Sequence, residues 1–219
     1  MNNALKTIRD HVLRTATFAL MVSLPVLALY IDIHWLHDEL GEWSLVELTQ
    51  ELFLLLSTLA FARLAWHNPR DRAFAVLAAG FMGSMLVREL DAMWDLVFRG
   101  LWQLLVSMIA ASCFIYALQD GRRAINALAR FLVSRSGTGV TMGLVLLLFY
   151  SRLFGMTALW QGLLGDAYIR VFKNAVEECT ELLGYTFILA GSLSYVRQQV
   201  RAPWSSAQSA ANGDLQPHA

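Results

Sequence analysis

Two stretches of the sequence carry glutamates at the same helical spacing. Residues 46–52 and 176–182 both read Val-Glu-x-x-x-Glu-Leu, so the two glutamates of each stretch lie one turn apart on one helix face. Carboxylates held this close together exchange protons and bind small cations. The seven-residue match fits either an internal duplication or a chance repeat. The glutamates of the two stretches are Glu47, Glu51, Glu177, Glu178 and Glu181.

A third charged motif occupies residues 87–95, which read Val-Arg-Glu-Leu-Asp-Ala-Met-Trp-Asp. In one continuous helix Arg88, Asp91 and Asp95 would share a face, because their spacing is i, i+3 and i+7. Glu89 would be rotated by about 100° from Arg88. We expect these groups in the same polar region as the glutamates. The acids of this motif are Glu89, Asp91 and Asp95, and the expected counter-charges of the whole region are Arg88, Arg152 and Lys173.

A separate cluster is formed by His34, His37 and Asp38. Two histidines at i, i+3 suit chelation of a divalent metal ion such as zinc, which would make the protein a metal-dependent membrane enzyme. The Glu-x-x-His pairs of di-iron bundles and the His-Glu-x-x-His motif do not occur in the sequence. The metal site is therefore the alternative hypothesis and not the leading one.

The composition predicts that these charges lie in a membrane protein. Of the 219 residues, 57% are apolar and only 16% are charged, whereas soluble domains average about 45–50% and about 25%. Such a chain is neither disordered nor an ordinary soluble globule. Two cysteines are too few for a disulfide framework, and the basic residues are not clustered with aromatic ones, so nucleic-acid binding is not expected.

Six apolar stretches are long enough for a transmembrane helix, which needs about 20 residues. The predicted fold is all-α: one polytopic integral membrane helical bundle over residues 1–202, followed by a disordered tail over 203–219. A short amphipathic helix at 122–133 is expected on the membrane surface, with Ile125, Leu128, Ala129 and Leu132 on its apolar face. The predicted spans are 16–36, 45–66, 73–98, 101–118, 139–159 and 171–196.

The distribution of charge predicts the orientation of the six spans. Most of the 17 basic residues lie before the first span, after the last, or between spans two and three and spans four and five. By the positive-inside rule both termini are then cytoplasmic, and the expected location is a bacterial inner membrane. Most of the 17 acidic residues lie at the opposite face. The rule does not explain this excess, because carboxylates contribute little to topology.

Three functions are compatible with intramembrane carboxylates. The first, which we favour, is transport or sensing of protons or small cations through an outward-facing polar site. The second is the metal-dependent enzyme, and the third is a non-catalytic assembly subunit held together by an ion-pair network, for example between Lys173 and Glu177 or between Arg88 and a glutamate of span two. The expected partners are the lipid bilayer and either a second copy of the chain or another subunit of a membrane complex.

Overall fold

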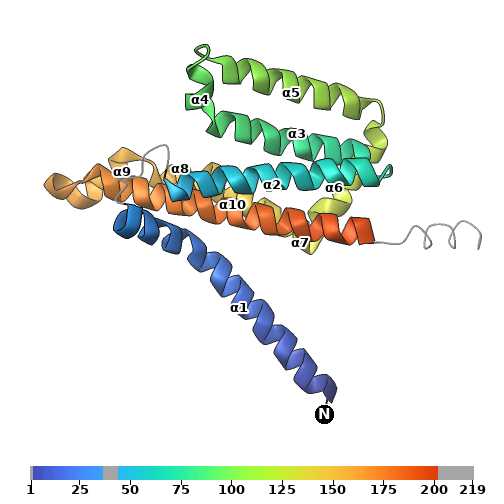
Figure 1. Cartoon of the computed structure of the whole chain (residues 1–219), viewed down its shortest axis with the longest axis horizontal. Coiled ribbons are helices and arrows are strands. Elements are labelled where there is room, and N and C mark those ends of the chain that lie inside the picture. Colours follow the sequence, from blue (N-terminus) through green and yellow to red (C-terminus); the bar gives the residue numbers. More distant parts are fainter. Residues whose placement is uncertain (1, 37–43, 202–219) are drawn as a thin grey trace, which may run out of the picture.

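The computed structural model of the protein describes residues 2–36 and 44–201, and all the regular elements in these two ranges are helices. Figure 1 shows them as a set of long, roughly parallel and antiparallel rods from which α1 diverges. The elements are α1 (Asn2–Ile31), the π-turn η1 (Asp32–Leu36), α2 (Leu45–His67), α3 (Arg72–Glu89), α4 (Asp91–Asp95), α5 (Leu101–Leu118), α6 (Gly121–Val133), α7 (Arg135–Val145), the π-turn η2 (Leu146–Tyr150), α8 (Ser151–Phe154), α9 (Thr157–Leu164), the 3₁₀ turn η3 (Gly165–Ala167) and α10 (Arg170–Arg201).

Four helical stretches of the described chain are long and apolar enough to cross a membrane. They fit the expected integral membrane protein and coincide with predicted spans one, two, four and five. The other two predicted spans are not among these four. Span three begins with α3, which carries three charged residues among its 18, and span six, 171–196, covers most of α10, whose first half is rich in glutamate. The four stretches are Ala4–Leu36, Leu45–His67, Leu101–Leu118 and Arg135–Phe154.

The third predicted span, 73–98, is not one continuous helix. Helix α3 ends at Glu89, and Leu90 has φ −85° and ψ 19°, so the chain turns before the five-residue α4 begins. Gly100 then adopts a φ of 82°, and its N–H donates to the Asp95 Oδ1 atom at 2.9 Å. Asp95 therefore stabilises the turn before α5, and the expected shared face of Arg88, Asp91 and Asp95 is wrong.

Two other boundaries differ from the expected ones. Helix α1 begins at Asn2 instead of 16, because the basic N-terminal residues continue the helix. The fifth predicted span, 139–159, ends at Phe154, where Gly155 and Met156 separate α8 from α9. The tail at 203–219 lies outside the described residues.

Helix α6 occupies the predicted position of the amphipathic helix, but a different face contacts the bundle. Its buried residues are Ala124, Ala127 and Phe131, whereas Ile125 is 67% exposed. The small alanines allow α6 to approach α3 and α7 closely, and Arg130 pairs with Asp71 at 2.5 Å. The predicted apolar face, including Leu128 and Leu132, remains exposed.

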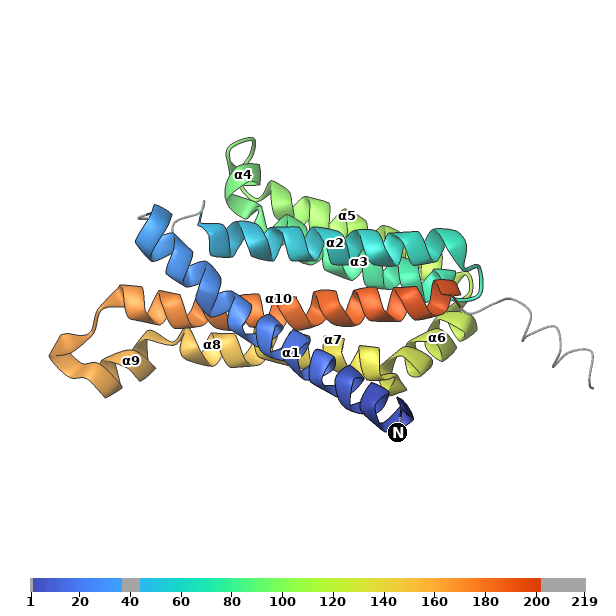
Figure 2. The same cartoon turned by 60° about the horizontal axis from the view of Figure 1, so that its bottom comes forward.

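The core of the bundle is formed by α2, α3, α7 and α10, with residues of α6 and η2 packed among them. In Figures 1 and 2, α2 and α10 lie side by side and run in the same direction. Helices α7 and α10 meet along a seam of glycines: a Cβ atom on Gly143 would lie 2.6 Å from the Gly184 carbonyl oxygen, and one on Gly191 would lie 2.7 Å from the Ser136 carbonyl oxygen. This close backbone approach is typical of membrane helix pairs.

Helices α1 and α5 lie at the periphery of this core. Helix α5 packs mainly on α3 and buries only Ala117. Helix α1 contacts α10 and α2 with its second half, while its first half diverges from them, as Figures 1 and 2 show. In a membrane, the apolar surfaces of both helices would face lipid.

Candidate functional site

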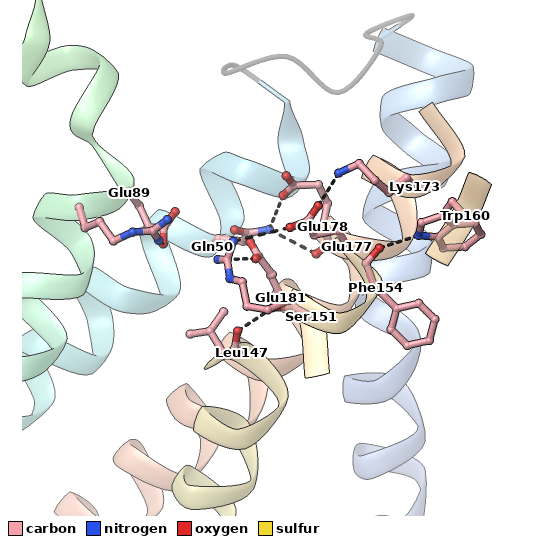
Figure 3. A network of polar contacts seen from close by, with 12 residues as sticks. Gln50, Glu89, Leu147, Ser151, Phe154, Trp160, Lys173, Glu177, Glu178 and Glu181 are labelled. Carbon is pink, nitrogen blue, oxygen red and sulfur yellow. Dashed lines mark hydrogen bonds and ion pairs between the residues drawn. The ribbon is translucent and has the colours of Figure 1, made fainter. Parts of the chain in front are cut away.

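Glutamates of α2, α3 and α10 gather at one end of the bundle with three cations. Figure 3 shows Glu177, Glu178 and Glu181 of α10 beside Gln50 of α2 and Lys173, with Glu89 of α3 to one side. This end holds the first turns of α2 and the last turn of α3, next to α8 and the first half of α10. We call it the carboxylate end. It comprises Gln50, Glu51, Arg88, Glu89, Arg152, Lys173, Glu177, Glu178 and Glu181.

Arg152 connects two turns of α10 by ion pairs. One guanidinium nitrogen lies 2.8 Å from Glu181 Oε1 and another lies 3.6 Å from Glu177 Oε1. Lys173 Nζ contacts the second oxygen of Glu177 at 2.8 Å, which confirms the expected i, i+4 pair. The Glu181 side chain is 8% exposed and the Arg152 side chain 49%, so Arg152 reaches the buried acid from the edge of the bundle.

A π-turn positions Arg152. Helix α7 continues without a break into η2 at 146–150 and then into α8, so one residue more than usual is accommodated in the helix just before Arg152. Such an insertion rotates every later side chain about the helix axis. Beside it, the buried Ser151 hydroxyl donates to the Leu147 carbonyl oxygen at 2.6 Å. No pattern in the sequence indicated this rotation.

Glu178 is held by an amide and not by a cation. The Nε2 atom of the buried Gln50 donates to Glu178 Oε2 at 3.0 Å and to the Glu178 carbonyl oxygen at 3.3 Å. This pair links α2 to α10 within the two Val-Glu-x-x-x-Glu-Leu stretches. Sequence analysis did not select Gln50, although its position between Glu47 and Glu51 on a helix with a buried face was a usable signal.

Glu89 sits between a cation and a phenol. Its Oε1 atom lies 2.6 Å from Arg88 Nη1 and accepts a hydrogen bond from the Tyr185 hydroxyl at 2.9 Å. Tyr185 is only 1% exposed, so α10 reaches the end of α3 through a partly buried hydrogen bond. The expected pairing of Arg88 with a glutamate of the second span is not found for Glu51 in the described part of the chain, where the ion pair of Arg88 is with its neighbour Glu89.

Glu51 and Glu89 face one another across a small pocket of about 100 Å³ between α2 and the α3–α4 break. Glu47 and Asp91 line the same pocket. Among the described residues, neither Glu51 nor Glu178 is in direct contact with a cation. The pocket is therefore lined by acids from α2, α3 and α4, and the sequence motifs had singled out all four of them.

The metal hypothesis receives little support from the described part of the chain. His34 is exposed, and its ring stacks on Tyr30 at a centroid distance of 4.1 Å. His37 and Asp38 lie outside the described residues. Within residues 2–36 and 44–201, no three His, Cys, Asp or Glu side chains are grouped closely enough to hold a metal ion.

One acid near the site has a clear structural role that sequence analysis missed. Asp32 is fully buried, and its two carboxylate oxygens accept from the Leu45 and Val46 N–H groups at 2.7 and 3.0 Å. Ser44 accepts from the Glu47 N–H at 3.2 Å. Together these two side chains satisfy the first free N–H groups of α2. Asp32 of η1, which directly continues α1, thus fixes the end of the helix that carries Gln50 and Glu51.

Comparison of the chain with protein-family models, with curated proteins and with solved structures found no match.

Proposed function

We propose that the protein moves or senses protons or small cations at the carboxylate end. The observation that carries this proposal is the imbalance of charge among the described residues there. Five glutamates from three helices face three cations, and no cation is among the described residues that line the acidic pocket beside Glu51 and Glu89. A purely structural network needs one cation for each ionised acid, because an unpaired charge in a membrane is costly. Acids that outnumber the cations are better explained as sites that gain and lose a proton or bind and release a cation.

The proposal includes six membrane spans, formed by α1, α2, α3, α5, α7–α8 and α10. Both termini would be cytoplasmic by the positive-inside rule, and a bacterial inner membrane is the proposed location. The carboxylate end would then open to the outer face. Its half-exposed member Arg152 would meet water there, whereas Glu181 would be shielded within the bundle.

The ion pairs and hydrogen bonds that connect the polar side chains of this end support the proposal. Arg152 can hold Glu177, Glu181 or both, and Lys173 also competes for Glu177. Exchange of partners within such a group moves charge without a large displacement of the backbone. Glu178 and Gln50 extend these contacts from α10 to α2, where Glu51 lines the acidic pocket.

Reconstitution tests the proposal directly. The full chain is placed in vesicles with a trapped pH-sensitive dye, a pH gradient is imposed, and its decay is followed with and without Na⁺, K⁺ or Ca²⁺. We expect Glu51→Gln to fold as the wild type does and to lose most of the protein-dependent signal. Asp166→Asn removes an exposed carboxylate from η3, outside the cluster, and should leave the signal unchanged.

Failure of the proposal would be equally clear. If vesicles with wild-type protein dissipate neither a proton nor a cation gradient, and no cation or pH change alters the protein's intrinsic tryptophan fluorescence, neither transport nor sensing occurs at this end. A loss of folded protein in every amide variant would instead support the assembly subunit held together by ion pairs.

A further inference from the structure

A long apolar groove runs between α3 and α5, and none of the residues that form the ion pairs of the carboxylate end lines it. It has a volume of about 690 Å³, within the range of about 300–1,000 Å³ that is common for ligand pockets. Its walls are mostly aliphatic and aromatic, and Ala117 is the one buried residue of α5. The groove is lined by Leu77, Phe81 and Ser84 of α3 and by Val106, Ala110 and Phe114 of α5, among others.

A basic pocket of about 370 Å³ lies between the first turn of α3 and the last turn of α5. Arg70, Arg72 and Arg123 line it together with Tyr116 and Gln119. Arg72 uses its Nε atom to donate to the Ala65 carbonyl oxygen at 3.0 Å, which leaves its two terminal nitrogens free of that contact. Asp120, also in the pocket, pairs with Arg123 at 2.9 Å, so three cations face one acid.

The helical spacing of the lining residues places the basic pocket at one end of the groove. On α3, Ala73 lines the basic pocket and Leu77 and Phe81 line the groove; with spacings of four residues, all three share one face. On α5, Cys113 of the groove and Tyr116 of the pocket are three residues apart, so they too are neighbours on one helix face. The groove thus leads from the apolar middle of α5 to arginines at the end of this span.

A second apolar groove runs along the other side of the same ridge of α3. It has a volume of about 300 Å³ and shares Leu77 and Phe81 with the first groove. Its other wall includes Ile125 of α6, two residues beyond Arg123 of the basic pocket. Two apolar grooves on either side of one ridge, with arginines at their common end, match the shape of a lipid with two acyl chains and an anionic headgroup.

We propose that this surface binds one diacyl anionic phospholipid, with its phosphate in the pocket of Arg70, Arg72 and Arg123 and its chains in the grooves beside Leu77 and Phe81. Arginine suits a phosphate because its planar guanidinium donates two parallel hydrogen bonds. The excess of positive charge disfavours zwitterionic lipids, whose amine would approach the same arginines. Apolar walls at membrane depth suit acyl chains, and the α5 helix that forms one wall is a candidate membrane span.

Retention of lipid by the purified full chain tests this proposal. The protein in detergent is mixed with phosphatidylglycerol or phosphatidylcholine of identical acyl chains, and bound lipid is counted by native mass spectrometry. We expect phosphatidylglycerol to be retained preferentially, and Arg70→Gln to weaken its retention about fivefold, which corresponds to about 1 kcal/mol. Ala110→Phe should reduce retention by filling the groove without changing the charge.

The matched control is Arg99→Gln, an exposed arginine in the turn before α5, at the other end of the same helix. It should retain phosphatidylglycerol as the wild type does. Equal retention of the two lipids, or an equal loss in Arg70→Gln and Arg99→Gln, would overturn the proposal. So would full displacement of the lipid by inorganic phosphate or glycerol 3-phosphate, because the site would then bind a free anion rather than a lipid.

Discussion

The two ends of the bundle are held together by opposite means. At the end opposite the glutamates, the rings of Phe61, Phe74, Phe131 and Tyr195 pack with centroid separations from 4.9 to 6.5 Å. We call these four residues the aromatic end. Like the carboxylate end, it joins α2, α3 and α10, and it adds α6 where the carboxylate end adds α8.

The two ends also differ in how their acids are paired with cations. Next to the aromatic end, the buried Asp71 pairs with Arg130 and also accepts from the Asn68 side chain at 3.2 Å, so that one acid meets one cation. At the carboxylate end, by contrast, acids outnumber cations. Well-packed apolar residues often stabilise a fold as well as a buried ion pair does, and the aromatic end shows that this chain has such a solution. The excess of acids at the carboxylate end is therefore better explained by the proposed proton or cation function than by a contribution to stability.

The largest effect on stability is expected at the aromatic end. Phe61 is fully buried and contacts all three other rings, so Phe61→Ala should lower the free energy of unfolding by about 3–5 kcal/mol. Denaturant titration in detergent micelles, followed by circular dichroism, measures this change. A loss below about 1 kcal/mol would show that the rings do not hold the helices together.

A smaller loss of stability is expected when charge pairs are broken, and it should differ between the one-to-one pair of Asp71 and the shared pairs of Arg152. Asp71→Asn breaks a one-to-one pair and should lower stability by about 1–3 kcal/mol. Glu181→Gln should cost about 1 kcal/mol or less, because Arg152 retains its second partner, Glu177. The same denaturant titration compares the two variants. If Glu181→Gln proves the more damaging, the carboxylate end is a structural network after all.

The smallest effect concerns a glycine beside the cluster. A Cβ atom on Gly155 would collide with the Glu177 carboxylate, so Gly155→Ala should displace that group and cost about 0.5–1 kcal/mol, since the end of a flexible side chain can give way. Gly162→Ala is the control, because nothing lies within 4 Å of its added Cβ atom. Thermal unfolding of both variants should show a lowered midpoint for Gly155→Ala alone; equal midpoints would mean that the Glu177 contacts add nothing to stability.

Hydrophobic length and glutamate spacing predicted much of this structure, because both are local properties. They placed α2 and α5 almost to the residue and paired Lys173 with Glu177. These two properties did not predict the break after Glu89 or the π-helical segment before Arg152. At both places tertiary contacts decide between backbone conformations of similar energy. The Asp32 cap was also missed, since it joins residues 13 and 14 positions apart in the chain and no periodicity indicates such a contact.

The central claim is that the carboxylate end moves or senses protons or small cations, while the aromatic end holds the helices together. The most direct test is proton or cation flux per folded molecule in vesicles for Glu178→Gln and Phe74→Leu. The amide at 178 can still accept from Gln50, so this variant should stay folded and lose its flux, whereas Phe74→Leu should lose stability and keep its flux. If both variants lose flux only in proportion to the protein that unfolds, both ends serve only to stabilise the fold. That result would contradict the claim.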